Sequence, residues 1–199
     1  MFPLNLANVL TLARILLVPV VVVALVVETP NGSIVAAAVF ALAAMTDGLD
    51  GYVARSRSSI TTFGKVMDPI ADKLLVAAAL ISLVSLERVE PWVAMVIIGR
   101  EFAVSGLRMA AAQQGIAIAA SPLGKLKTIV QVGAVMALIA ASDTGAAWVQ
   151  ALAYAMVAIT LVSGADYFLA FRRDLEAARR RALEKRRRAG VASGGVEPR

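Results

Sequence analysis

The sequence predicts an all-α integral membrane protein with six transmembrane helices and with its N- and C-termini in the cytoplasm. Three observations support this fold class. Of the 199 residues, 59% are hydrophobic, and the mean hydropathy is +0.77, whereas a soluble domain is only about half apolar. The apolar residues form six runs, each near the length of about 20 residues with which an α-helix crosses a bilayer. Short segments rich in turn-forming residues separate several of these runs.

The first predicted span is expected to be retained rather than cleaved as a signal peptide. It has no basic segment before it, and Arg14 lies inside its apolar run. Loop signals follow at ETPNG (28–32), ERVEP (87–91) and SDTG (142–145). The spans predicted in this way are residues 8–27, 33–52, 68–86, 91–112, 125–142 and 146–171.

Basic residues orient the predicted spans. With the N-terminus in the cytoplasm, 19 of the 20 Lys and Arg residues fall on the cytoplasmic side, and Arg88 alone falls outside. Cytoplasmic loops carry such an excess. The chain is expected to divide into a membrane domain (1–172) and a basic cytoplasmic tail (173–199), partly helical and then disordered. Contact with solvent and lipid head groups is the ordinary role of such a tail, and no nucleic-acid partner is expected of it.

The chain contains no cysteine and no histidine. This composition excludes disulfides, thiolate metal sites and imidazole chemistry. Any acid–base or metal chemistry must therefore use carboxylates, hydroxyl groups, Lys or Arg. The net charge of +6 favours an anionic membrane surface or an anionic substrate.

Four aspartates lie in one polar stretch around the second and third predicted spans. Asp47 and Asp50 are three residues apart, and Asp68 and Asp72 are four apart, so each pair shares a helix face. Two helix ends joined by a loop of about a dozen residues would bring the carboxylates together. Because they would repel one another, we expect Mg²⁺ or Mn²⁺ between them, as one or two ions. The structural alternative makes Asp68 and Pro69 an N-cap and N1 pair.

The polar stretch resembles the signature of the CDP-alcohol phosphatidyltransferases at all eight defining positions. It reads Asp47-x-x-Asp50-Gly51-x-x-Ala54-Arg55, then eight residues, then Gly64-x-x-x-Asp68-x-x-x-Asp72. The resemblance implies transfer of a phosphatidyl group from CDP-diacylglycerol to an alcohol, with two metal ions. It implies metal ligands at Asp47, Asp50 and Asp68, a general base and further metal ligand at Asp72, and CDP binding at Gly51, Ala54, Arg55 and Gly64.

Five other stretches resemble the bacterial phosphatidylglycerophosphate synthases within this family. They are NVLTLARILLVPV (8–20), MDPIADKLLVAAAL (67–80), IIGREFAVSGLRMAAAQQG (97–115), LGKLKTIVQ (123–131) and SGADYF (163–168). This resemblance implies sn-glycerol 3-phosphate as the acceptor, a bacterial inner-membrane location with the active site facing the cytoplasm, and a homodimer. Inositol phosphate or a second phospholipid stays open as the acceptor.

A dianionic acceptor needs cations beyond those that serve the pyrophosphate. Arginine suits bidentate phosphate binding, and the cationic candidates on the cytoplasmic side are Arg100, Arg108, Lys125 and Lys127. Two alternatives stay open: Arg100 pairs with Glu101 or with a motif aspartate, and the two lysines are ordinary positive-inside residues.

Two further groups of polar residues lie within predicted spans. Asn8, Thr11 and Arg14 recur at helical spacing on the first span and resemble a polar stripe of the family, where substrate contact and helix packing are equally good interpretations. Asp166 and Tyr167, in the sixth span, are expected to form hydrogen bonds between helices.

Two other functions fit part of the pattern. A membrane prenyltransferase also uses Asp and Mg²⁺ on pyrophosphates, but two separated Asp motifs and more spans would be expected. A divalent-cation transporter could hold carboxylates in the membrane, but its site should lie near the midplane. The aspartates here are expected at the cytoplasmic end, beside Arg55.

Overall fold

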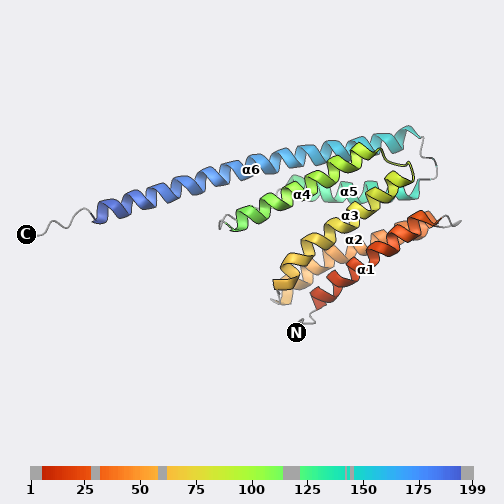
Figure 1. The fold of residues 1–199 in the computed structure, drawn as a ribbon, viewed down its shortest axis with the longest axis horizontal. Coiled ribbons are helices and arrows are strands. Elements are labelled where there is room, and N and C mark those ends of the chain that lie inside the picture. The colour runs from red at the N-terminus through yellow and green to blue at the C-terminus, as the bar shows by residue number, and fades with distance from the viewer. Residues whose placement is uncertain are drawn as a thin grey trace, which may run out of the picture.

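The chain forms a bundle of α-helices (Figure 1). The structure is a computed structural model, and it describes residues 6–27, 32–57, 62–113, 122–141, 143 and 146–193. No strand occurs among these residues, which confirms the all-α class. The helices are α1 (Leu6–Val26), α2 (Gly32–Arg57), α3 (Thr62–Ser85), α4 (Pro91–Gln113), α5 (Pro122–Ala140) and α6 (Ala147–Ser193).

Each of the six predicted apolar runs coincides with one helix, but the helix ends differ. Because α2 continues to Arg57 and α3 begins at Thr62, only residues 58–61 separate them, and the predicted loop of about a dozen residues is wrong. The N-cap interpretation of Asp68 is also wrong, since this residue lies inside α3. Hydropathy marks where a segment stops being apolar, whereas a helix can continue through Ala, Arg and Lys, which have high helix propensity.

The bundle turns much of its aliphatic surface outward. Leu16, Ile34, Met95 and Ile129 are each more than 60% exposed, as expected of helices that face lipid. Among the described residues, two segments, α5 and Ala147–Arg181 of α6, are long and apolar enough to cross a membrane, while α1, α2 and α3 contain shorter apolar segments. These features fit a membrane protein, while six crossings and cytoplasmic termini stay predictions.

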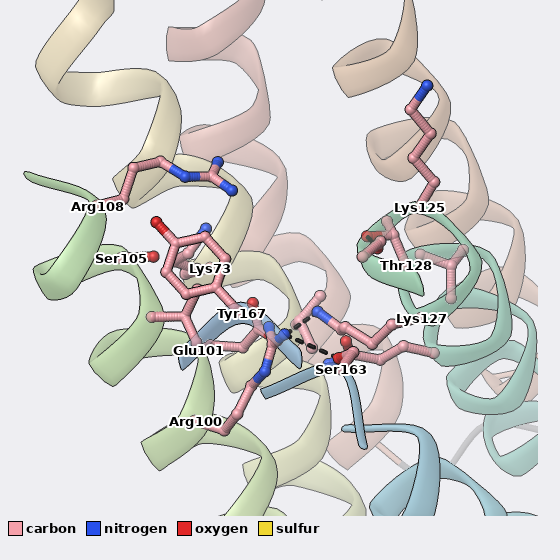
Figure 2. Close-up of a pocket in the computed structure, with 15 residues that line it drawn as sticks. Lys73, Arg100, Glu101, Ser105, Arg108, Lys125, Lys127, Thr128, Ser163 and Tyr167 are labelled. Carbon is pink, nitrogen blue, oxygen red and sulfur yellow. Dashed lines mark hydrogen bonds and ion pairs between the residues drawn. The ribbon is translucent and has the colours of Figure 1, made fainter. Parts of the chain in front are cut away.

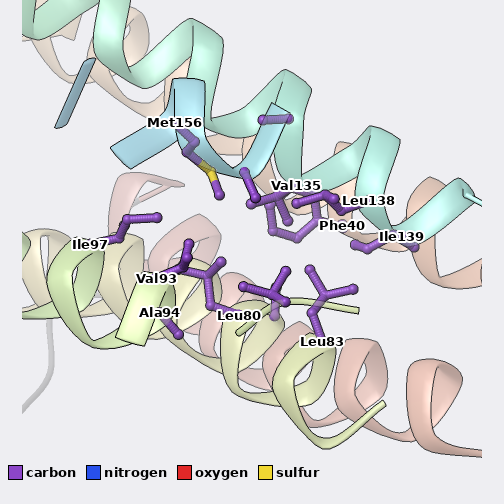
Figure 3. Packing of buried hydrophobic residues seen from close by; sticks show 14 of the residues in the cluster. Phe40, Leu80, Leu83, Val93, Ala94, Ile97, Val135, Leu138, Ile139 and Met156 are labelled. Carbon is purple, nitrogen blue, oxygen red and sulfur yellow. The ribbon is translucent and has the colours of Figure 1, made fainter. Parts of the chain in front are cut away.

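The apolar core lies between the helices on the side of the α3–α4 connection. Figure 3 shows Phe40 of α2, Leu80 and Leu83 of α3, and Leu138 and Ile139 of α5 packed together. Alanines at the contacts let the helix backbones approach closely; the fully or almost fully buried ones include Ala36, Ala43, Ala79, Ala94 and Ala134. α1 packs against α2 and α3, while α4 and α5 both pack against α6.

Arg88, in the α3–α4 connection, binds both α5 and α2 at this end of the bundle. It lies between α3 and α4, and its Nη1 donates to the carbonyl oxygens of Ile139 (2.7 Å) and Leu138 (3.3 Å) in the last turn of α5. Its Nη2 donates to Ser33 Oγ (3.4 Å) at the start of α2. The last carbonyl groups of a helix have no partner within the helix, and a cation there also complements the helix dipole. Arg88 therefore caps α5 and ties it to α2.

Replacing Arg88 with Ala is expected to lower the free energy of unfolding by about 1.5–3 kcal/mol, the scale of hydrogen bonds to a charged group. Denaturation of the purified protein in detergent measures this loss. Arg172→Ala is the matched control, because Arg172 forms an exposed pair with Glu176, at 3.7 Å, and such pairs contribute less than about 1 kcal/mol. Equal, small effects of the two substitutions would contradict the capping role.

Candidate functional site

A cavity of about 270 Å³ lies between α3, α4, α5 and α6. Among the described side chains, its charged lining consists of one carboxylate, Glu101, and five cations, Lys73, Arg100, Arg108, Lys125 and Lys127 (Figure 2). The four cations proposed from the sequence for an acceptor phosphate thus line a single pocket, together with a fifth from α3. A pocket with this balance of charge attracts anions.

Glu101 binds two of these cations at once. Its Oε1 lies 3.2 Å from Arg100 Nη1 and also accepts a hydrogen bond from Lys127 Nζ. The three side chains are only 7–14% exposed, so the pairing reduces the cost of burying their charges. The alternative that Arg100 pairs with Glu101 is therefore observed. Lys127 is buried, so it differs from an ordinary positive-inside lysine at a membrane surface.

Arg100 also reaches α6. Its Nη2 donates to Ser163 Oγ at 2.8 Å, and Gly164 leaves space for its side chain. A Cβ atom on Gly164 would lie 3.3 Å from Arg100 Cγ and 3.4 Å from Nε. We call Arg100, Glu101, Lys127 and Ser163 the inner cluster. Neither Ser163 nor Gly164 has a role predicted from its own residue type, although both lie in the SGADYF stretch that shows part of the resemblance.

Arg108 and Lys125 lie on different sides of the pocket, away from the inner cluster (Figure 2). Both are exposed, and within the described ranges neither has a carboxylate at ion-pair distance. The guanidinium of Arg108 lies 5.5 Å from the centroid of the Tyr167 ring, a cation–π geometry that restrains it. These two residues, which we call the outer cations, are therefore the best placed to bind an anion that enters the pocket.

Two uncharged polar groups in the pocket wall lack hydrogen-bond partners among the described residues. They are the Tyr167 hydroxyl and Gln131 Nε2, on residues that are only 5% and 2% exposed. Buried polar groups without partners are rare and costly, so both groups are suited to a ligand. The expectation that Tyr167 forms a hydrogen bond between helices is wrong for the described part of the chain.

The eight signature residues lie on two adjoining helices, although their side chains are outside the described residues. Asp47, Asp50, Gly51, Ala54 and Arg55 lie in the second half of α2. Gly64, Asp68 and Asp72 lie in the first half of α3, which contacts α2. The described side chains include no cluster that could hold a metal, so the metal ligands stay a prediction. Lys73, which lines the pocket, directly follows Asp72 in the sequence, so the pocket adjoins the end of the signature on α3.

The polar stripe of α1 is buried where the structure describes it. Thr11 and Arg14 are each 1% exposed, on a helix that packs against the two signature helices; the side chain of Asn8 is outside the described residues. A fully buried arginine at this position faces neighbouring helices and not lipid. Substrate contact and helix packing both remain consistent with this burial.

Comparison with known proteins adds a family match. The family model of the CDP-alcohol phosphatidyltransferases matches residues 4–163, which include the whole signature and most of the pocket. The CDP-diacylglycerol–glycerol-3-phosphate 3-phosphatidyltransferase of Bacillus subtilis is 40% identical, over 82% of this chain and 93% of the relative. A probable phosphatidylglycerophosphate synthase of Mycobacterium tuberculosis is 41% identical, over 89% and 87%. A CMP-forming cardiolipin synthase of Oryza sativa is 39% identical, over 80% of this chain and 53% of the relative.

Glu101→Gln is expected to lower the free energy of unfolding by about 3 kcal/mol, because removal of one partner leaves buried charges without compensation. Denaturation in detergent measures this change. The double variant Glu101→Gln with Lys127→Gln should recover part of the loss, since one of the two uncompensated cations is then absent.

Glu87→Gln is the control for this experiment. It removes an exposed carboxylate from the α3–α4 connection and should have little effect. If Glu101→Gln is no more destabilising than Glu87→Gln, the inner cluster does not depend on Glu101.

Proposed function

The chain belongs to the CDP-alcohol phosphatidyltransferase family, and from that premise we propose that it transfers the phosphatidyl group of CDP-diacylglycerol to sn-glycerol 3-phosphate. The products are phosphatidylglycerophosphate and CMP, so the reaction is a step of phospholipid biosynthesis. The main support for this acceptor is the cation-lined pocket, which includes Lys73, the residue that follows Asp72. Relatives named for this reaction, similar over more than four fifths of the chain, support the same choice.

The size and charge of the pocket favour a small phosphorylated alcohol. Its volume of about 270 Å³ is below the roughly 300–1,000 Å³ typical of sites for drug-sized ligands. Glu101 partly compensates Arg100 and Lys127 in the inner cluster, so a phosphate dianion is attracted more strongly to the outer cations, Arg108 and Lys125. Arg100 and Lys127, which Glu101 holds, then shape the pocket and contribute charge at longer range.

The reaction forms one P–O bond and breaks another. The primary hydroxyl of glycerol 3-phosphate attacks the phosphatidyl phosphorus, CMP leaves, and a carboxylate takes the hydroxyl proton. We assign this base to Asp72, because it immediately precedes a pocket residue and the chain has no histidine. The outer cations bind the phosphate of the acceptor, so that the primary hydroxyl at its other end extends toward α3. The proposed binding site for the CDP group comprises Gly51, Ala54, Arg55 and Gly64.

The donor set proposed for the metal consists of oxygen atoms only. Four carboxylates on two adjoining helices, without His or Cys anywhere in the chain, match the ligand preference of Mg²⁺ and Mn²⁺. Two such ions, held by Asp47, Asp50, Asp68 and Asp72, would neutralise the pyrophosphate charge and stabilise the attacking and leaving oxygens.

We further propose six membrane crossings with the pocket open to the cytoplasm. Both tryptophans of the chain, Trp92 and Trp148, lie at the start of α4 and α6, and Trp92 stacks on Tyr154. Tryptophan is enriched at both membrane interfaces, so this end is assigned to an interface, and the excess of Lys and Arg toward the opposite end makes it the outer one. Along α4, Arg100 is then about 12 Å and Arg108 about 24 Å from Trp92, at 1.5 Å per residue. A homodimer, implied by the resemblance, is a further proposal.

The acceptor is tested with purified protein in detergent or vesicles that contain CDP-diacylglycerol. Release of CMP is measured without acceptor and with glycerol 3-phosphate, inositol phosphate or phosphatidylglycerol. We expect the fastest release with glycerol 3-phosphate. Faster release with phosphatidylglycerol would instead support the second candidate, a cardiolipin synthase activity, for which the Oryza sativa relative is the supporting observation. No release with any acceptor would reject the proposed function.

Removal of divalent ions with excess chelator is expected to abolish CMP release, because four neighbouring carboxylates would then repel an anionic pyrophosphate. Addition of Mg²⁺ or Mn²⁺ in excess should restore it. Asp50→Asn should stay inactive after this addition while the protein still inserts and folds. Undiminished release in the presence of chelator would contradict the metal proposal.

Arg108→Ala is expected to raise the KM for glycerol 3-phosphate by roughly 10- to 100-fold, which corresponds to a charge-assisted hydrogen bond worth about 1.5–3 kcal/mol. The KM for CDP-diacylglycerol should change much less. Arg55→Ala should show the opposite pattern, because Arg55 is assigned to the nucleotide. Steady-state kinetics with each substrate varied at saturating partner measure both values. An equal rise of both KM values in both variants would mean that Arg108 does not bind the acceptor specifically and that Arg55 does not bind the nucleotide specifically.

A further inference from the structure

We propose that the buried hydroxyl of Tyr167 donates a hydrogen bond to the phosphate group of the acceptor. This inference rests on the proposed function, because it identifies a further phosphate ligand in the same pocket. Tyr167 lies beyond residues 4–163, which the family model matches, so neither the signature nor the match assigns it a role. The assignment comes from its burial, its missing partner and its contact with Arg108.

The hydroxyl of Tyr167 is placed to serve a ligand. The residue is 5% exposed, and its hydroxyl has no hydrogen-bond partner in the part of the chain that the structure describes. The ring lines the pocket, and the hydroxyl points to the side where Ser105 and Arg108 lie (Figure 2). A phenylalanine would fill the same space without the cost of an unpartnered hydroxyl. The hydroxyl is therefore accounted for by a partner that enters the pocket.

The charges in the pocket indicate which part of the ligand meets this hydroxyl. Arg108 lies over the Tyr167 ring at 5.5 Å, so an anion bound by Arg108 comes close to the same wall. Glu101 partly compensates the two cations of the inner cluster, so the phosphate is attracted more strongly to the outer cations. An O–H donor to a phosphate oxygen forms a strong, charge-assisted hydrogen bond. Unlike a further arginine, it adds no positive charge to a pocket that already contains five cations.

Tyr167 therefore has two separable roles. Its ring restrains the Arg108 guanidinium, and its hydroxyl binds the phosphate directly. Tyr167→Phe removes only the second role, since phenylalanine keeps the ring and the cation–π contact. Tyr154→Phe is the matched control, because Tyr154 is exposed and stacks on Trp92 outside the pocket.

The test compares binding of the whole acceptor with binding of inorganic phosphate, a probe without the glycerol. For Tyr167→Phe we expect the KM for glycerol 3-phosphate to rise about 10-fold, the scale of one hydrogen bond to a charged group. The inhibition constant of inorganic phosphate, competing with glycerol 3-phosphate, should rise by the same factor. The KM for CDP-diacylglycerol should be unchanged. Tyr154→Phe should change none of these values.

Stability without ligand separates this role from a structural one. Because the hydroxyl has no partner among the described residues, Tyr167→Phe should be at least as resistant to thermal unfolding as the unmodified protein. Inorganic phosphate, added in chelator so that no divalent ion holds it, should raise the unfolding temperature of the unmodified protein more than that of the variant. A variant clearly less stable without phosphate would show that the hydroxyl has a structural partner, and would overturn the proposal.

Two kinetic outcomes would also overturn it. If the KM for glycerol 3-phosphate rises while the inhibition constant of phosphate stays constant, the hydroxyl contacts the glycerol and not the phosphate. If neither value changes, Tyr167 is not a ligand. Failure of the proposed function is distinguishable from both, because the unmodified protein would then release no CMP with glycerol 3-phosphate, while the unfolding experiment with phosphate still tests Tyr167.

Discussion

Glu101 is the constraint on which the polar half of this bundle depends. Five cations around one pocket are electrostatically unfavourable, because they repel one another and because Arg100 and Lys127 have also lost most of their water. Glu101 compensates two of them, Arg100 and Lys127, at the buried end. Arg100 in turn binds Ser163 beside Gly164. The same carboxylate therefore stabilises the contacts among α4, α5 and α6 and lowers the positive charge at the buried end of the pocket.

The two ends of the bundle are stabilised differently. At the end with the α3–α4 connection, aliphatic side chains fill the core, and Arg88 satisfies the last carbonyls of α5. At the other end a pocket lies between the helices, and the side chains of the inner cluster bind one another in its wall. Packing at the first end holds the helices in place, so the second can contain groups that are satisfied only by a ligand.

Much of this organisation could be predicted from the sequence, because it depends on local patterns. Hydropathy located all six helices, and the spacing of the aspartates identified the signature. The positive-inside rule predicted one side of the membrane for Arg100, Arg108, Lys125 and Lys127, and in the structure all four line one pocket. Helix ends were less predictable: α3 begins before Asp68, since charged residues end an apolar run without ending a helix.

Contacts between distant helices could not be predicted. Ser163 meets Arg100 across 63 positions of the chain, and nothing near Ser163 in the sequence indicates that partner. Gly164 could be recognised only once the path of the Arg100 side chain was known. The environment of Tyr167 was predicted incorrectly for the same reason, since a tyrosine in a span usually finds a hydrogen-bond partner on a neighbouring helix. The sequence alone does not distinguish a tyrosine whose hydroxyl binds a ligand from one whose hydroxyl binds a neighbouring helix.

The outward-facing aliphatic surface has a consequence for how the proposed reaction is quantified. Side chains such as Leu16 and Ile129 hold the protein in the lipid phase, so the lipid donor reaches it by lateral diffusion in two dimensions. The acceptor arrives from water, in three. The relevant concentration of the donor is then its mole fraction in the bilayer or micelle, whereas that of the acceptor is its molarity. Adding neutral lipid or detergent lowers the mole fraction of the donor without changing the molarity of the acceptor. The apparent affinity for the donor therefore depends on the amount of lipid or detergent, and the apparent affinity for the acceptor does not.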